Sequence, residues 1–99
     1  MARMCVLGGG LVGRFVAHTL HERGHYVRVV DAESVASLPP NIEVIQSLVN
    51  PENLVNLVGG FDVTINCLPG RIGHSVRPHL LTIEGMRVAD LAFTAEDPR

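Results

Sequence analysis

Six residues near the start of the chain have the spacing of a phosphate-binding turn. Residues 8–13 read Gly-Gly-Gly-Leu-Val-Gly, which matches the pattern G-x-G-x-x-G. In such a turn Gly8 permits a sharp bend after a strand, and Gly10 lets the backbone approach a pyrophosphate. Gly13 allows the following helix to pack closely on the sheet. A helix that begins at Leu11 would point its free N–H groups, and the positive end of its dipole, at the phosphates.

One carboxylate favours the interpretation of this turn as a dinucleotide site. Asp31 ends an apolar run and follows Gly13 by 18 residues, close to the spacing of about 20 for an acid that binds ribose hydroxyls. Its charge would repel a 2′-phosphate, Glu33 adds to that repulsion, and no arginine occurs between residues 32 and 38. We therefore expect NAD rather than NADP. The alternative is a glycine turn without a ligand, and the combination of strand, turn, helix and acid argues against it.

Alternating strand and helix patterns place this turn in an α/β fold. Short apolar runs predict strands, and apolar stripes at helical spacing between capping residues predict helices. The predicted strands cover residues 4–7, 26–30, 42–45, 61–68 and 86–91, and the predicted helices cover residues 11–23, 52–58 and 76–84. Strands linked by helices form parallel sheets with right-handed crossovers. We expect a Rossmann-like, doubly wound sheet of order 3-2-1-4-5.

Capping residues predict where two of the helices begin. Asn50 and Pro51 have the residue types of a cap and a first helical position. Ser75 is a candidate cap for the last helix, which would place Pro78 in its first turn, where a missing N–H costs little. Residues 32–41 contain two prolines and leave room for one helical turn at most.

Composition limits the protein to one small globular domain and excludes several classes of function. The 99 residues are 46% hydrophobic, enough for a core. The net charge of −2, with eight arginines and no lysine, argues against nucleic acid as a partner. No run reaches the roughly 20 apolar residues of a membrane span. Cys5 and Cys67 lie in apolar runs without metal spacing, so we expect reduced thiols and a cytoplasmic protein.

A second group of candidate residues follows the fourth predicted strand. Ligands of open α/β sheets bind beyond the carboxyl ends of the strands, near the point where the strand order reverses. Cys67, Leu68 and Pro69 are therefore expected beside the part of the cofactor distal to adenine. An ordinary Pro-Gly turn at the end of a strand explains these residues equally well.

Three blocks of sequence resemble the N-terminal domains of the saccharopine dehydrogenase-like family, which includes saccharopine reductase and lysine dehydrogenase. The first block is V-L-G-x-G-x-V-G at residues 6–13, and the second is D-V-x-I-N-x-L-P at residues 62–69. The third is x-V-x-D-x-[AS]-F at residues 87–93, followed by Glu-Asp-Pro at residues 96–98. The resemblance spans essentially the whole chain, and the second and third blocks together are more specific than the first.

The resemblance implies the cofactor domain of an oxidoreductase that acts on an amino-bearing carbon of a lysine-derived substrate. It also implies that residues 67–69 line the nicotinamide side and that Asp90 faces the cofactor or the substrate. Family members continue with a large substrate domain that is missing from residues 1–99, so we expect catalysis to need that domain or a partner subunit. The predicted cofactor-binding residues are Gly8, Gly10, Leu11, Val12, Gly13, Asp31, Cys67, Leu68 and Pro69.

No catalytic or metal-binding set emerges from the remaining residues. His18 and His21 have a spacing that places two ligands on one helix face, but no third ligand lies nearby, and a solvated face is the better interpretation. His74 and His79 follow the Pro-Gly turn and could approach a nicotinamide, where a histidine can transfer protons. Such residues more often begin a helix, and neither is assigned a catalytic role. The alternative function is a nucleotide-sensing regulatory module without catalysis. A structural fragment with an incomplete site is the third possibility.

The last predicted strand would leave an exposed apolar edge. It ends in Leu-Ala-Phe at residues 91–93, where family members have further sheet or a second domain. Exposed apolar edges pair readily with another chain. We therefore expect a homodimer formed through this edge.

Overall fold

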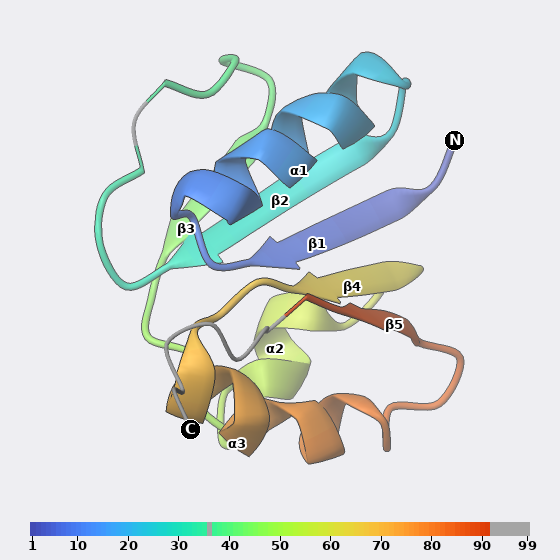
Figure 1. Ribbon diagram of the computed structural model, residues 1–99. Helices are drawn as coiled ribbons and strands as arrows, with labels where there is room; N and C mark the ends of the chain where they lie inside the picture. The colour runs from blue at the N-terminus through green and yellow to red at the C-terminus, as the bar shows by residue number, and fades with distance from the viewer. Residues whose placement is uncertain (36, 92–99) are drawn as a thin grey trace.

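A parallel sheet forms the middle layer of the protein (Figure 1). The computed structural model describes residues 1–35 and 37–91, and all statements below refer to them. The strands are β1 (Arg3–Leu7), β2 (Tyr26–Asp31), β3 (Glu43–Gln46), β4 (Val63–Asn66) and β5 (Arg87–Asp90). They are arranged in the order β3-β2-β1-β4-β5, which confirms the predicted Rossmann-like topology.

The register aligns the carboxyl ends of the three middle strands. Leu7, the last residue of β1, pairs with Val30 of β2 on one side and with Asn66 of β4 on the other. Each of these strands then leads into a loop at the same edge of the sheet. Groups contributed by β1, β2 and β4 therefore meet there.

Helices cover both faces of the sheet and create two cores (Figure 1). Helix α1 (Leu11–Glu22) lies on one face, while α2 (Leu54–Val58) and α3 (Gly70–Leu80) lie on the other. Side chains of a strand alternate between faces. The core under α1 contains Val6, Ala17, Val27, Val29, Ile42 and Ile65. The core under α2 and α3 contains Cys5, Leu7, Val30, Leu54, Leu57, Val58, Phe61, Leu68, Val76 and Leu80.

The last helix differs from the prediction of residues 76–84. It begins at Gly70, directly after the extended residue Pro69, and ends at Leu80. Ser75 does not cap it, because the Ser75 hydroxyl donates to the Ile72 carbonyl within the helix, at 2.9 Å. Pro78 lies in the last turn rather than the first, where its missing N–H removes one bond of the ladder and does not end the helix.

Other boundaries shift by a few residues. The predicted helix at 52–58 is regular only over Leu54–Val58, and its N-cap position is Asn53 rather than the predicted Asn50. The Asn53 N–H donates to the Asn50 side chain and the Asn50 N–H donates to the Asn53 side chain, each at 3.0 Å. The fourth strand is shorter than predicted, and the described residues of the 32–41 connection contain no helical turn.

Part of the predicted dimer edge lies outside the described residues. Leu91 is 42% exposed, whereas residues 92–93 of that edge and residues 96–98 of the family resemblance are not described. Within the described residues, none of the helices has the length and apolar character needed to cross a membrane.

Candidate functional site

A cleft of about 350 Å³ opens where the carboxyl ends of the strands meet the N-terminus of α1. This volume lies near the lower limit of small-molecule sites. Eight of the nine predicted cofactor residues line the cleft: Gly8, Gly10, Leu11, Val12, Gly13, Asp31, Cys67 and Pro69. The ninth, Leu68, is placed differently from the expectation. Its side chain is buried in the core under α2 and α3, because neighbouring residues of an extended segment point to opposite faces.

Two glycines of the turn are required by close contacts within the protein. Gly8 has a positive φ of +102°, and a Cβ there would lie 2.9 Å from the Cys67 carbonyl oxygen. A Cβ on Gly13 would lie 1.8 Å from the Gly8 carbonyl oxygen, far closer than a non-bonded carbon and oxygen can approach. These contacts bind the turn to the start of α1 and to the end of β4. They explain two of the three glycines of the motif.

Gly10 is different, because neither its packing nor its backbone conformation requires a glycine. Its φ is −74°, which any residue adopts. A Cβ at this position would meet no described atom within 4 Å, and Gly10 lines the cleft. The space beside Gly10 is therefore open at the edge of the cleft.

The N-terminus of α1 presents free backbone donors to this open space. The first bond of the helix runs from the Arg14 N–H to the Gly10 carbonyl at 2.9 Å. The N–H groups of residues 11–13 precede that bond and have no acceptor in the helical ladder. The first turn contains no acidic side chain, and Gly10 contributes no side-chain cap. These groups and the helix dipole favour an anionic ligand.

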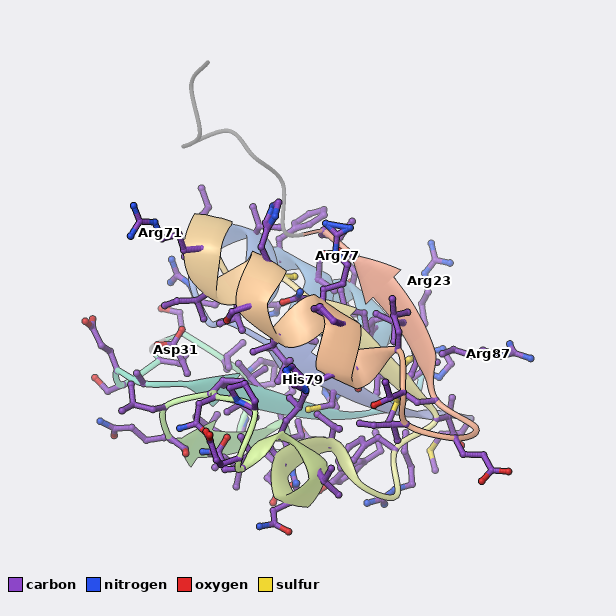
Figure 2. The ribbon with its side chains drawn as sticks, turned by 90° about the horizontal axis from the view of Figure 1, so that it is seen from below. Arg23, Asp31, Arg71, Arg77, His79 and Arg87 are labelled. Carbon is purple, nitrogen blue, oxygen red and sulfur yellow. The ribbon has the colours of Figure 1, made fainter. Side chains whose placement is uncertain are left out.

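Asp31 holds the glycine turn and keeps part of its acceptor capacity. One carboxylate oxygen accepts the Gly9 N–H at 2.5 Å, and the other accepts the Glu33 N–H at 2.8 Å. An ionised carboxylate has about four acceptor positions, so about two remain for hydroxyl groups of a ligand. Figure 2 shows Asp31 at the same end of the molecule as Arg71, while Arg23 and Arg87 lie at the opposite end.

The arginine of the same strand is directed to the other face of the sheet. Arg28 donates to the Glu43 carboxylate at 2.9 Å and to the Leu57 carbonyl at 2.8 Å. Since Leu57 belongs to α2, these bonds hold the Arg28 guanidinium on the face opposite α1. The guanidinium is therefore engaged in hydrogen bonds on the side of the sheet away from the cleft.

Cys67 forms a neutral part of the cleft wall. Burial, and to a smaller extent the nearby Asp90 carboxylate, raise the pKa of its thiol to about 11. The thiol is therefore protonated at neutral pH. The Cys67 N–H donates to the Leu7 carbonyl at 2.9 Å, which anchors this segment to β1.

Asp90, expected to face the cofactor or the substrate, is not among the residues that line the cleft. One of its carboxylate oxygens accepts from Arg77 of α3 at 2.6 Å. The other lies 3.4 Å from the side-chain nitrogen of Asn66. The sequence analysis assigned no role to Asn66. A polar amide within an apolar strand was nevertheless a signal, because a buried amide needs hydrogen-bond partners.

The histidines lie apart from the cleft lining. His18 contacts the Ser37 carbonyl at 2.9 Å, and His25 accepts the Ala2 N–H at 3.0 Å. In the part of the chain that the structure describes, no group of three or more His, Cys, Asp or Glu residues is placed to hold a metal ion.

Comparison with known proteins gives likeness of structure only. N5-carboxyaminoimidazole ribonucleotide synthetase from Thermotoga maritima superposes on 89% of this chain with a TM-score of 0.70 and 27% identity. A variant of uronate dehydrogenase from Agrobacterium tumefaciens, complexed with NAD, matches 66% with a TM-score of 0.54 and 27% identity. N5-carboxyaminoimidazole synthetase from Staphylococcus aureus, complexed with ADP, matches 88% with a TM-score of 0.64 and 19% identity.

These structures are much longer than the present chain. It spans 24%, 25% and 23% of their respective lengths. No protein-family model and no curated protein matches it. The comparisons establish a Rossmann-like fold of the kind found in nucleotide-binding proteins, and none of the three structures is a saccharopine dehydrogenase.

Proposed function

We propose that the cleft binds a nucleotide, with a phosphate at the N-terminus of α1 and ribose hydroxyls on Asp31, and that NAD is the preferred ligand. The observation that carries this proposal is the open space at Gly10. A glycine that neither packing nor backbone conformation requires stands in front of free helix N–H groups. Close approach of a phosphate to the backbone accounts for the missing side chain.

The surroundings of Asp31 support NAD over NADP. Its carboxylate retains about two acceptor positions, which suit the two hydroxyls of a ribose. A 2′-phosphate would instead meet the charges of Asp31 and Glu33, while Arg28 is held on the other face of the sheet. The uronate dehydrogenase structure, at 27% identity, contains NAD, which agrees with this choice.

The finer form of the proposal is the cofactor domain of an oxidoreductase of the saccharopine dehydrogenase type. It rests on the sequence blocks at residues 6–13, 62–69 and 87–93. In that case the substrate is a lysine-derived amine, with residues 67–69 and Asp90 toward its side of the cofactor. Activity would require a substrate domain or a partner subunit in addition to this fold.

A mononucleotide is the second candidate ligand, and two observations favour it. The ribonucleotide synthetase matches more of this chain, 89%, than the NAD-bound dehydrogenase does. The cleft volume of about 350 Å³ is also small for a dinucleotide. In this case the domain would contribute to a synthetase or act as a nucleotide sensor without catalysis.

Calorimetric titration with NAD⁺, NADH, NADPH and ADP separates these possibilities. We expect NADH to bind more tightly than NADPH, and Gly10→Ala to weaken binding about tenfold or more, equivalent to about 1.4 kcal/mol. Glu22→Ala, at the other end of α1, is the control and should bind normally.

Each other outcome has a distinct meaning. Tighter binding of ADP than of NAD⁺ would favour the mononucleotide candidate. Tighter binding of NADPH would overturn the role given to Asp31. A folded sample that gives no heat with any of the four ligands would overturn nucleotide binding altogether.

A further inference from the structure

Asn66, the last residue of β4, has a fully buried side chain whose polar atoms are all used. Its exposed fraction is 0%. The side-chain nitrogen donates to the Gly73 carbonyl at 3.1 Å and to the Asp90 carboxylate at 3.4 Å, while the side-chain oxygen accepts the Leu68 N–H at 3.3 Å. Burying an amide is unfavourable unless its hydrogen bonds are replaced, so this side chain connects segments that would otherwise be separate.

The three partners of Asn66 belong to three different segments of the chain. Leu68 lies in the turn that carries two of the lining residues. Gly73 lies in the first part of α3, and Asp90 ends β5. Asp90 is in turn paired with Arg77 of α3 at 2.6 Å. One amide thus fixes the turn after β4 relative to α3 and β5.

That turn is in direct backbone contact with the glycine turn. A Cβ built on Gly8 would lie 2.9 Å from the Cys67 carbonyl oxygen and 3.3 Å from the Leu68 nitrogen. The Leu68 N–H is the group that donates to the Asn66 side-chain oxygen. A displacement of the Cys67–Leu68 peptide is therefore transmitted directly to Gly8, and through the turn to the N–H groups at the start of α1.

We infer that Asn66 is a positioning residue for the glycine turn. Its amide fixes the Cys67–Leu68 peptide against Gly8 and so sets the position of the backbone donors that face the cleft. The consequence for ligand affinity rests on the proposed nucleotide binding. The consequence for the position of the turn does not, because it concerns the ligand-free protein.

The polarity of the amide, and not only its shape, is essential to this role. The atoms facing the Asn66 nitrogen, the Gly73 carbonyl and the Asp90 carboxylate, accept hydrogen bonds, whereas the atom facing its oxygen is an N–H donor. Asn66→Asp keeps the shape but places an oxygen against both acceptors. Asn66→Ala removes all three bonds. We expect both variants to displace the turn.

Thr64→Val is a matched control on the same strand. Thr64 lies two residues before Asn66, so it points to the same face of the sheet, and it is likewise 0% exposed. Its hydroxyl lies 3.2 Å from the Met86 sulfur rather than at the turn after β4. The control therefore removes a buried polar contact of β4 without loosening the cleft wall.

The test combines amide NMR of the ligand-free protein with NAD⁺ titration, at a temperature where every variant is folded. Asn66→Ala and Asn66→Asp should shift the amide resonances of residues 8–13 and weaken NAD⁺ binding about tenfold or more. Thr64→Val should leave both unchanged, whatever its loss of thermal stability. If the alanine and aspartate variants do not fold, Asn66→Ser, which keeps a hydroxyl, takes their place with the same expected shift.

Unchanged resonances of residues 8–13 in a folded Asn66 variant would overturn the inference, whether or not NAD⁺ binds. Equal shifts in Thr64→Val would overturn it too, because they would show a general response of β4. Shifted resonances in a protein whose wild type binds no nucleotide would uphold the positioning role and refute the proposed function.

Discussion

The two ends of the sheet differ in how far their polar groups are paired within the protein. At the amino end a cluster of Arg3, Tyr26, Arg28, Glu43 and Phe61 uses its polar groups internally, and we call it the amino-end cluster. Glu43 accepts from Arg28 at 2.9 Å and also from the Tyr26 hydroxyl. The Arg3 guanidinium lies 4.7 Å from the ring centroids of both Tyr26 and Phe61. The polar groups of this partly exposed cluster are therefore paired with one another.

At the carboxyl end, hydrogen-bonding groups keep unused donor and acceptor capacity. Asp31 accepts two backbone N–H groups and keeps further acceptor positions, and the N–H groups of residues 11–13 precede the helical ladder. Gly10 leaves the space before them open. The contrast shows that unused donors and acceptors around open space, rather than the number of charges, distinguish a candidate binding site from a structural network.

The largest effect expected at the carboxyl end is that of Gly13→Ala. The added methyl group would overlap the Gly8 carbonyl oxygen, 1.8 Å away, and backbone atoms yield less than side chains do. We expect a loss of about 3 kcal/mol or more in the free energy of unfolding, measured by urea denaturation. Gly10→Ala, its control, should lose no more than about 1 kcal/mol. Equal losses in the two variants would remove the distinction between fold-required and ligand-required glycines.

Cys67 provides a chemical probe of the same end. Because burial raises its pKa from 9.0 to about 11, the thiolate fraction at pH 8 should be about a hundredfold lower than for a free thiol. Alkylation by iodoacetamide, followed by mass spectrometry, should be slowed by about that factor and slowed again by a ligand in the cleft. Cys5, fully buried with a pKa raised to about 12, is the internal control and should react still more slowly. Alkylation of Cys67 at the rate of a free thiol would show that its pKa is not raised by burial.

Removing Glu43 tests whether the amino-end cluster is mutually satisfied. Glu43→Ala leaves Arg28 and the Tyr26 hydroxyl without their shared acceptor, and we expect a loss of about 1–2 kcal/mol, between the values of exposed and buried pairs. Adding Arg28→Met should recover part of this loss, because the unpaired guanidinium disappears. A double-mutant cycle from denaturation curves measures the coupling. Additive losses would mean that the pair is not coupled.

The sequence predicted the carboxyl end of the sheet better than the amino end. The carboxyl end is built mainly from residues close together in the chain, whereas the amino end depends on contacts between residues far apart in the chain. The glycine turn, its helix and Asp31 form one local unit, and the register of a parallel sheet then brings Cys67 and Pro69 to the same edge. Strand order follows from the alternation of strands and helices. These features depend on spacing and periodicity, which a single sequence displays.

The remaining features depend on contacts between distant residues or on weak local preferences. The bond from the Arg3 N–H to Asp62 joins residues 59 apart, and that from Arg28 to Leu57 joins residues 29 apart. No local pattern encodes such pairs. The start of α3 was misplaced because Ser75 and Pro78 both fit a helix start, whereas the observed helix begins earlier and buries Gly73 in addition to Val76 and Leu80. Tertiary packing overrides local propensity in such cases.

The smallest expected effect is the pH dependence that Glu43 contributes, and it sharpens the contrast between the two ends. Hydrogen bonds from Arg28, and then from Tyr26, lower the pKa of Glu43 below its ordinary value of 4.5. A carboxyl whose pKa is lowered by folding contributes stability that is present above the unfolded pKa and is lost as the pH falls through the folded pKa. The free energy of unfolding of the wild type should therefore fall more steeply below pH 4.5 than that of Glu43→Gln. If Glu43→Gln retains the wild-type slope, the folded state binds protons at Glu43 as the unfolded chain does, and the amino-end cluster is an exposed group of charges rather than a mutually satisfied network.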